Sequence, residues 1–247
     1  MELPRSTGPV PVDALEVLDG CPRRFQLRFL EGHREPRAGT GGEGLSPRHR
    51  DGRLEAIRSL VAALAPEAWG AGLPDEVLGA AAGRAGLTLS EAEALDLLRP
   101  LRRLGRALRT FTAGFSWSTA VPFHVRLGEA SVEGRFDLLL SGAPGEAALR
   151  LVAGAREGRA TVAVLLAALR ERAGEGREVR AAAFPVDGDE ETIRWRSEPS
   201  VAPSALEAGL VSALALGSAL APALDRPACE ALGCGFVARC HSSGRGL

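Results

Sequence analysis

The sequence contains no lysine, no asparagine and no tyrosine, and Gln26 is its only glutamine. Every one of the 30 basic residues is therefore arginine. The absence of lysine excludes Schiff-base chemistry, a P-loop lysine and a catalytic ammonium group. The bias toward Ala, Gly, Leu and Arg is typical of a coding preference. The missing residue types thus exclude chemistries without themselves indicating a function.

Signals for secretion and membrane insertion are also weak. No basic region followed by an apolar run occurs at the N-terminus, which predicts a cytoplasmic protein. The apolar segment from Val201 to Leu224 contains Pro203, Glu207 and Pro222, so we expect a buried helix there and no membrane partner. The formal net charge of -1 gives no general attraction to polyanions. Nucleic-acid binding would require local clusters of arginine.

The 247 residues are 45% hydrophobic, enough for one sizeable core. We expect a single domain over residues 1–247, with a helical subregion at 46–110, an α/β core at 115–200, and a C-terminal helix and cysteine loop at 201–247. Gly32 to Gly44 has the composition of a flexible loop. In the N-terminal region, apolar spacing predicts helices at Val12–Leu18, from Pro22 onward, and at Ser46–Leu64. Asp13 is placed to cap the first of these.

Leu73–Leu108 is expected to be helical in pieces, opened by Pro74, with a capping box at Ser90 and Glu93 and a break or kink at Pro100. Short apolar runs beyond Phe115 then predict strands. The expected order is strands at Thr119–Leu127, Ala130–Leu140 and Leu149–Val152, a helix at Arg159–Ala173, a strand at Glu178–Val186, an edge strand at Thr192–Trp195 and a helix at Ser204–Leu220. This order predicts a mixed α/β sheet with flanking helices.

All four cysteines lie near the two ends of the chain, at Cys21, Cys229, Cys234 and Cys240. In a reducing compartment such residues are more often ligands than disulfide partners. We therefore expect them to share a metal ion or a cluster. Arginines also gather on one predicted helix: Arg99, Arg102, Arg103, Arg106 and Arg109. They form either a solvated helix face or a stripe of phosphate contacts.

Three motifs carry a family resemblance: Cys21-Pro22-Arg23-Arg24-Phe25, the strand Val132-Glu133-Gly134-Arg135-Phe136-Asp137, and the terminal loop with three cysteines. Together with the element order, they resemble the RecB-type PD-(D/E)xK nucleases that carry an iron-sulfur cluster, as in AddAB helicase-nucleases and CRISPR-associated four-cysteine exonucleases. The resemblance implies a restriction-endonuclease-like core whose two ends are joined at a 4Fe-4S cluster.

The same resemblance implies that the four cysteines ligate that cluster. The spacing between Cys229 and Cys234 is wider than in much of the family, which leaves Zn2+ in a four-thiolate site as an alternative. His241, beside Cys240, is expected to be a surface residue rather than a ligand.

The catalytic motifs of the family are largely missing. Asp137 occupies the first metal-binding position, but the resemblance aligns alanines with the second acid, the lysine, the early histidine and a further glutamate, namely Ala153, Ala155, Ala56 and Ala120. The family's Gln-x-x-x-Tyr motif falls near Thr161 and Leu165. A single carboxylate is a poor Mg2+ site because that ion demands near-octahedral oxygen ligation. We therefore expect no Mg2+ and regard Asp137 as vestigial.

The resemblance thus implies a catalytically inactive, DNA-binding or scaffolding domain in DNA repair or recombination, associated with a helicase of the UvrD or AddA type. Its DNA partner would be a single strand or a duplex end. The expected phosphate contacts are Arg23, Arg24, Arg102, Arg103 and Arg106. Two alternatives remain: an active metal-dependent nuclease in which Asp137 works with Glu133, Glu146 or Glu157, and a purely structural partner of a helicase subunit.

Overall fold

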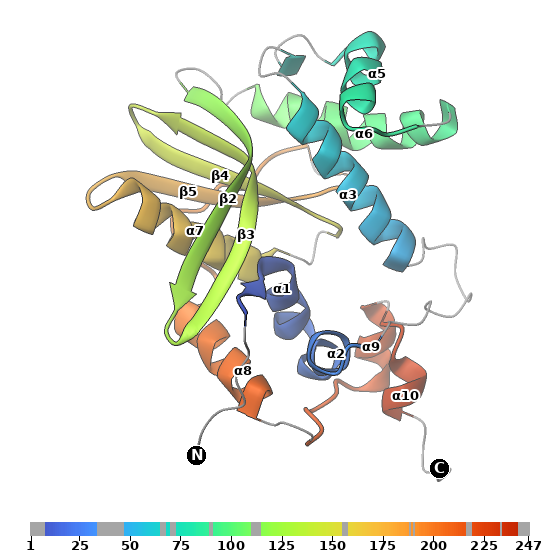
Figure 1. Ribbon diagram of the computed structural model, residues 1–247, viewed down its shortest axis with the longest axis vertical. Helices are drawn as coiled ribbons and strands as arrows, with labels where there is room; N and C mark the ends of the chain where they lie inside the picture. The colour runs from blue at the N-terminus through green and yellow to red at the C-terminus, as the bar shows by residue number, and fades with distance from the viewer. Residues whose placement is uncertain are drawn as a thin grey trace.

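The computed structural model describes most of the chain. The described residues are 8–33, 47–64, 68–69, 73–88, 91–109, 115–154, 158–187, 189, 191–215, 219–232 and 234–241. Figure 1 shows a central sheet with helices on both faces. The predicted loop at Gly32–Gly44 falls almost wholly outside the described residues, and so do Ser90 of the predicted capping box, Ala155 and Glu157.

The sheet has five strands: β1 (Val10–Pro11), β2 (Phe115–Leu127), β3 (Ala130–Gly142), β4 (Gly145–Val152) and β5 (Glu178–Pro185). β2 runs antiparallel to β3 over nearly its whole length. On the other edge of β3, β1 pairs in parallel near one end and β4 pairs antiparallel near the other, and β5 lies parallel to β4. The predicted mixed α/β sheet is therefore confirmed. β2 and β4 begin earlier than their apolar runs suggested.

A tight turn joins β3 to β4 at Gly145, which has φ of 145°. A Cβ atom there would lie 2.0 Å from the backbone oxygen of Glu178, so a side chain at this position would force the parallel partner strand away. The edge strand expected at Thr192–Trp195 is wrong. The next residue, Arg196, makes a single antiparallel bridge with Ala181, whereas Ile193 and Trp195 pack against the core.

One face of the sheet is covered by α1 (Val12–Gly20), α7 (Arg159–Ala173) and α8 (Pro203–Ala215). The other face is covered by α3 (Pro47–Ala63), α5 (Asp75–Arg84) and α6 (Glu91–Leu108). α7 has its predicted bounds and connects β4 to the parallel strand β5, as a parallel pair requires. Its apolar residues are buried nearly all round, typical of a helix enclosed by other elements.

Several helix predictions need correction. Pro11, not Asp13, is the N-cap of α1, and no side chain caps that helix. Pro100 lies inside a continuous α6, and the predicted helix end at Leu220 is wrong, since Leu220 lies outside any helix and α8 is described over Pro203–Ala215. No helix in the described part of the chain is long and apolar enough to cross a membrane.

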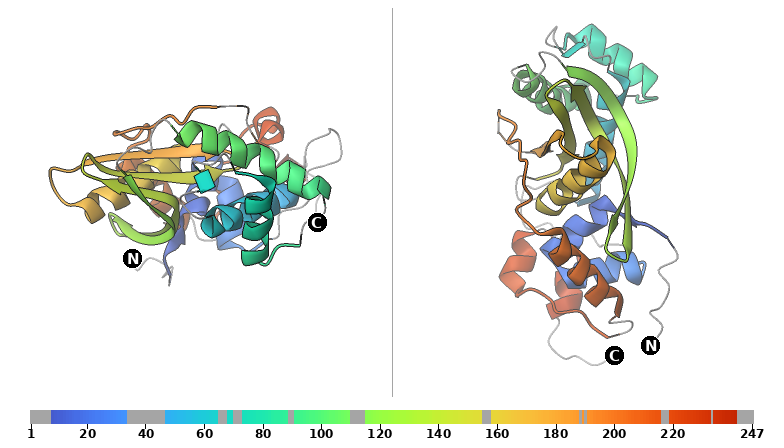
Figure 2. Two further views of the ribbon diagram at one scale, coloured as in Figure 1. Left: turned by 90° about the horizontal axis from the view of Figure 1, so that it is seen from above. Right: turned by 90° about the vertical axis from the view of Figure 1, so that its left-hand side faces the viewer.

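Short helical segments from near the two ends of the chain lie side by side at the end of the molecule opposite α5 and α6 (Figures 1 and 2). They are α2 (Pro22–Phe25) and the wider π-helical turn η1 (Gln26–Leu30) from the start, and α9 (Arg226–Ala231) and α10 (Val237–His241) from the end. Gln26 joins η1 to the segment that precedes α9: its amide nitrogen donates to the oxygen of Ala219 at 2.7 Å, and its side-chain oxygen accepts from the backbone nitrogen of Ala221 at 2.8 Å.

Candidate functional site

Asp137 lies in β3 with its carboxylate buried beneath α3. One carboxylate oxygen accepts a hydrogen bond from the backbone nitrogen of Leu151 at 2.7 Å, which ties β3 to the end of β4. The same oxygen accepts from Nε of Arg58 at 3.3 Å. The second oxygen lies 3.9 Å from a nitrogen of Arg150 and 4.0 Å from Nε of Arg135. Asp137 is thus surrounded by donors and cations from the protein itself.

Arg58 and Arg150 reach Asp137 because a second acid holds them. Nη2 of Arg150 contacts both carboxylate oxygens of Asp13, at 2.9 and 2.8 Å. Arg58 donates to Asp13 at 3.3 and 3.4 Å and to the backbone oxygen of Leu151 at 2.8 Å. Four elements, α1, α3, β3 and β4, therefore meet in one network of two acids and two buried arginines. Arg guanidinium groups suit this role because they present five donors in a fixed plane.

The two acids of this network respond oppositely to their surroundings. Burial raises the pKa of Asp137 above its ordinary value, although Arg58 and Arg150 oppose the shift. Burial also acts to raise the pKa of Asp13, but Arg150 and Arg58 outweigh it and lower that pKa overall. The difference follows from exposure, since the side chain of Asp13 is 53% exposed and that of Asp137 only 2%.

The described alanines that the resemblance aligns with catalytic groups lie on α3, on β2 and just after β4. Ala56 is half-buried on α3, two residues before Arg58, and Ala153 is buried just after the end of β4. Ala120 lies opposite Asp137 between β2 and β3, at the one position within the paired stretch where the two strands form no residue pair. Its φ is 52°. Thr161 and Leu165 are buried on α7, where the backbone nitrogen of Thr161 donates to Glu16.

The acids considered as alternative metal ligands lie elsewhere. Glu146 pairs with Ser141 at the start of β4, four residues along β3 from Asp137, which is about 13 Å of strand. Its carboxylate makes an ion pair with Arg172 instead. Glu133 pairs across the sheet with His124 and Pro11, and Glu157 lies outside the described residues. The structure therefore does not bring Glu133 or Glu146 to Asp137.

The four cysteines from the two ends of the chain lie close together and are not joined as disulfides. Cys21, Cys229 and Cys234 are buried and Cys240 is partly buried. Cys229 and Cys234 form a small apolar cluster with Leu27 and Phe236, against which Cys240 packs. α9 presents Cys229 because Asp225 caps that helix, its carboxylate accepting from the nitrogen of Ala228 at 2.8 Å.

The pKa shifts of these thiols reflect how close the four cysteines lie to one another. Burial, followed by the neighbouring Cys21, Cys234 and Cys240, raises the pKa of Cys229 to about 11. Burial likewise raises the pKa of Cys240, and a hydrogen bond from Arg23 opposes the shift. His241 is half-buried with Nε2 3.5 Å from Sγ of Cys229, closer to the thiols than the sequence indicated. A bound cation would favour the thiolate forms that burial disfavours.

Within the described residues, no group of three or more His, Cys, Asp or Glu side chains is arranged so that it could hold a metal ion. The donor set itself consists of four sulfur atoms drawn from both ends of the chain. Thiolates are the ligands that iron-sulfur clusters and structural zinc share. The donor type of the four cysteines therefore suits either group, whereas their arrangement among the described residues does not form a metal site.

The predicted DNA-contacting arginines have different surroundings. Arg103 is buried, donates to the backbone oxygens of Pro185 and Val186 and lies over the ring of Phe184. Arg23 is also buried and donates to Gln26. Both guanidinium groups are buried and bond to other groups of the protein, so neither is placed to contact a phosphate at the surface. This corrects the expectation for both residues.

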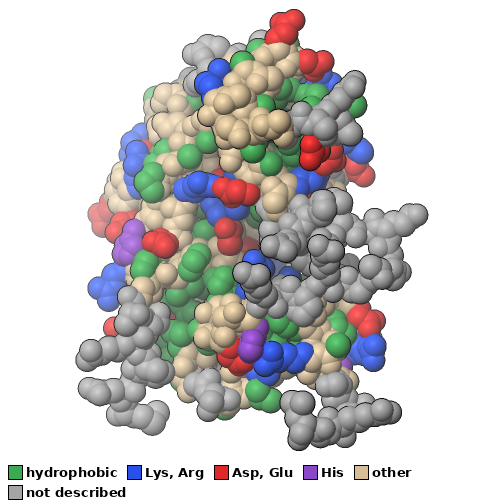
Figure 3. All heavy atoms as spheres, turned by 45° about the vertical axis from the view of Figure 1, so that its right-hand side comes forward, with side chains coloured by type: hydrophobic (Ala, Val, Ile, Leu, Met, Phe, Trp, Pro, Cys, Tyr) green, Lys and Arg blue, Asp and Glu red, His purple; other side chains and the backbone are tan. Residues whose placement is uncertain are grey.

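Arg102 and Arg106 are about half-exposed on α6 and pair with Asp75 and Glu191 at 2.8 Å. Arg99 pairs with Asp189 in the same way, and Arg24 is partly buried. Figure 3 shows basic and acidic side chains interspersed over one face of the molecule. Exposed ion pairs of this kind contribute about 0–1 kcal/mol, so an incoming phosphate can exchange with the acidic partner.

No family model matches the chain, and no curated protein matches it. The residues that sequence reasoning missed are Arg58, Arg150 and the pairing role of Asp13. One signal was available in the sequence: Arg150 is the one charged residue in the predicted strand Leu149–Val152, and a charge inside such an apolar run requires a buried partner.

Proposed function

We propose that the chain is a catalytically inactive domain of the RecB-type nuclease kind, which binds DNA during repair or recombination beside a helicase. The observation that carries this proposal is the set of contacts made by Asp137. In the nucleases that the chain resembles, this acid holds a metal ion with other oxygen ligands. Here its partners are Arg58, Arg150 and a backbone nitrogen.

The charge and the donor groups around Asp137 explain why these contacts argue against metal binding. Two guanidinium groups close to one carboxylate supply the positive charge that a metal would bring, and they repel a divalent cation. They cannot ligate a metal or activate a water molecule, since guanidinium has donors and no acceptor. With alanine at the aligned positions Ala56, Ala120 and Ala153, the described site also lacks the further oxygen ligands that Mg2+ requires.

The proposal includes a restriction-endonuclease-like core. Its support is the connection of β2, β3 and β4 as an antiparallel meander, followed by α7 and the parallel strand β5. This is the element order on which the resemblance rests. Asp137 in the central strand β3, next to the end of β4, lies where such a core would hold its active site.

We further propose that Cys21, Cys229, Cys234 and Cys240 hold a 4Fe-4S cluster, with Zn2+ as the alternative. The cluster would supply a cross-link between the chain ends and no catalytic step. Closing a loop of about two hundred residues removes entropy from the unfolded chain, so the folded state gains stability. Gln26 and the apolar contacts around Leu27 already align the same two segments.

The decisive experiment is incubation of single-stranded and duplex DNA with the protein and Mg2+ or Mn2+. We expect no cleavage by the wild type or by Asp137→Ala. Cleavage by the wild type that Asp137→Ala abolishes would overturn the proposal, because it would show a working metal site at this acid. Cleavage that persists in Asp137→Ala would indicate a contaminating nuclease.

A purely structural role is the second candidate. It is favoured by the pairing of Arg99, Arg102 and Arg106 with acidic residues, which leaves no large single-sign patch on the described face in Figure 3. Titration of a labelled oligonucleotide at increasing salt separates the two roles. Binding that weakens steeply with salt supports the DNA-binding role. Absence of binding at low salt supports the structural role.

A further inference from the structure

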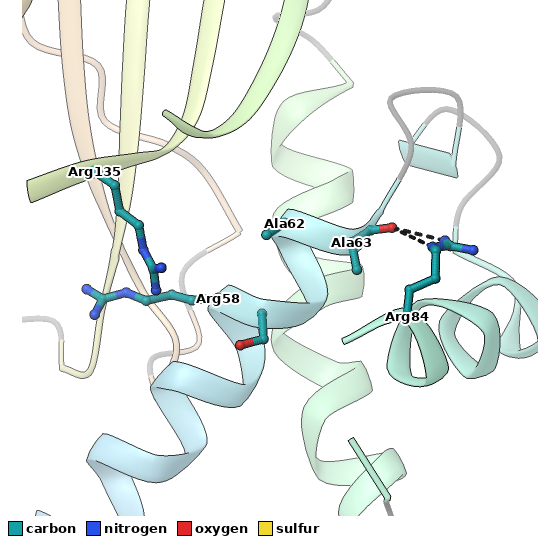
Figure 4. Close-up of a pocket in the computed structure, with 6 residues that line it drawn as sticks. Arg58, Ala62, Ala63, Arg84 and Arg135 are labelled. Carbon is teal, nitrogen blue, oxygen red and sulfur yellow. Dashed lines mark hydrogen bonds between the residues drawn. The ribbon is translucent and has the colours of Figure 1, made fainter. Parts of the chain in front are cut away.

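An open cavity of about 340 Å³ lies beside the Asp137 network, where α3 meets α5 and β3. Figure 4 shows the side chains around it. It is lined by Arg58, Ser59, Ala62, Ala63, Arg84 and Arg135. Three of these six residues are arginines and none is acidic, in contrast to the mixed charges on the surface nearby. The volume is at the small end of the range for ligand sites.

Contacts within the protein orient the three arginines before any ligand arrives, Arg58 most firmly because its side chain is buried. Arg58 is fixed by Asp13, Asp137 and the oxygen of Leu151. Nε and Nη2 of Arg84 donate to the backbone oxygen of Ala63, at 3.1 and 2.9 Å. Arg135 donates to Glu55 at 2.6 Å. Binding to donors that are already oriented costs less conformational entropy than binding that must first order flexible side chains.

The local charge is positive. The cavity and the adjoining Asp137 network together hold four guanidinium groups, those of Arg58, Arg84, Arg135 and Arg150, and three carboxyl groups, those of Asp13, Glu55 and Asp137. Figure 4 shows Arg58 and Arg135 on one side of the cavity and Arg84 on another. The short side chains of Ala62 and Ala63 leave space between these arginines, and Ser59 adds a hydroxyl group to the lining. Planar guanidinium donors around a small hollow suit an oxyanion such as phosphate.

We infer that this cavity binds a phosphate group of a nucleic-acid backbone, with Arg84 and Arg135 as its principal contacts and Ser59 beside them. Arg58 would contribute charge to the same cavity while it holds Asp137. This inference rests on the proposed DNA-binding function and names the place where the backbone is held. It assigns phosphate binding to α3, α5 and β3, apart from the exposed arginines of α6.

The test is binding of a fluorescein-labelled single-stranded oligonucleotide, measured by anisotropy at several salt concentrations. Arg84→Ala and Arg135→Ala should each weaken binding by about tenfold or more, since a charge-assisted contact is lost. Each should also reduce the slope of log K against log salt by about one. Arg180→Ala is the matched control, because Arg180 is an exposed arginine paired with Glu178 far along the chain from the cavity.

A second pair of variants guards against misfolding. Ser59→Glu places a carboxylate in the cavity, and Ser59→Gln places a neutral group of the same size there. Ser59→Glu should weaken oligonucleotide binding by at least tenfold relative to Ser59→Gln. Equal affinities for the two variants would overturn the inference, since charge in the cavity would then be irrelevant to binding.

The outcomes for the cavity and for the proposed function are distinguishable. Oligonucleotide binding that none of the cavity variants weakens more than Arg180→Ala does would overturn the cavity assignment and leave the DNA-binding role intact. Absence of oligonucleotide binding by the wild type would overturn both. In that case, titration with inorganic phosphate identifies the source: binding that depends on Arg84 and Arg135 would make the site one for a free phosphate and contradict its assignment to nucleic acid.

Discussion

Arg58 and Asp137 form a buried ion pair between α3 and β3, with Nε of Arg58 3.3 Å from the carboxylate of Asp137. The two side chains are 7% and 2% exposed and stand 79 residues apart in the sequence. The pair fixes a helix against the sheet at the place that the proposed nuclease-like core assigns to its active site. It therefore links the stability of the fold to the proposed loss of catalysis.

Removal of one partner of this pair should be costly. Arg58→Met leaves Asp137 buried with fewer donors, and we expect a loss of about 3 kcal/mol in the free energy of unfolding. The double variant Arg58→Met, Asp137→Leu should cost less than the sum of the two single variants, because each single change already removes the Arg58–Asp137 pair. Urea denaturation of the wild type, both single variants and the double variant measures the coupling. Additive effects would show that the pair is energetically unimportant.

Stability should depend on pH with opposite signs at Asp137 and Asp13. The pKa of Asp137 is raised in the folded state. Between pH 3.8 and that raised pKa the folded state therefore binds more protons than the unfolded state, and stability falls as the pH rises through this range. The folded-state pKa of Asp13 is lowered, so its contribution is present above pH 3.8 and is lost as pH falls below it. Unfolding free energies of Asp137→Asn and Asp13→Asn, compared with the wild type from pH 3 to pH 7, should show these two trends. Curves parallel to the wild type would contradict the assignment.

Gln26 should be needed to hold the C-terminal segment against η1. Gln26→Met keeps the length of the side chain but removes its bonds to Ala219 and Ala221, which are 193 and 195 residues away. We expect a loss of about 1–3 kcal/mol for the buried groups left without partners. Hydrogen exchange at the amide of Ala221 should accelerate in the variant. Unchanged exchange there would show that other contacts hold the segment.

Metal content tests the cysteine centre directly. Anaerobic purification should give a coloured protein with about four iron atoms and four sulfide ions per chain, and Cys229→Ser should lower both and reduce the melting temperature. His241→Ala is the control for the neighbouring imidazole and should retain the group, since the thiols supply all four ligands. Colourless protein with neither iron nor sulfide would eliminate the cluster. One zinc ion per chain would establish the alternative.

Ala120 offers a test of backbone strain beside Asp137. Its φ of 52° lies in the left-handed region, which costs a residue with a Cβ atom about 1–2 kcal/mol. Ala120→Gly removes that strain but adds entropy to the unfolded chain, so we expect a net gain of up to about 1 kcal/mol. Chemical denaturation measures the change. A loss of stability would mean that the methyl group of Ala120 contributes packing worth more than the strain.

Local patterns were sufficient to predict much of the secondary structure. The apolar residues of α7 and the short apolar runs of β3 depend on neighbours within a few residues, so the existence and approximate bounds of both elements could be predicted from sequence. The predicted edge strand at Thr192–Trp195 and the cap at Asp13 failed for a related reason. Asp13 pairs with Arg150, 137 residues away, instead of capping its helix, and Ile193 and Trp195 pack against a core cluster built from other parts of the chain.

The sequence by itself determined which chemistries are possible: without lysine or tyrosine no alignment restores the family's catalytic groups, and four cysteines at the two ends make a shared thiolate centre possible. Only the tertiary structure decided what surrounds those groups. It buried Arg23 and Arg103, brought Arg58 and Arg150 to Asp137, and formed a cavity lined by arginines. Burial and long-range pairing set the charge environment of a side chain, and neither is encoded in residue type or spacing alone.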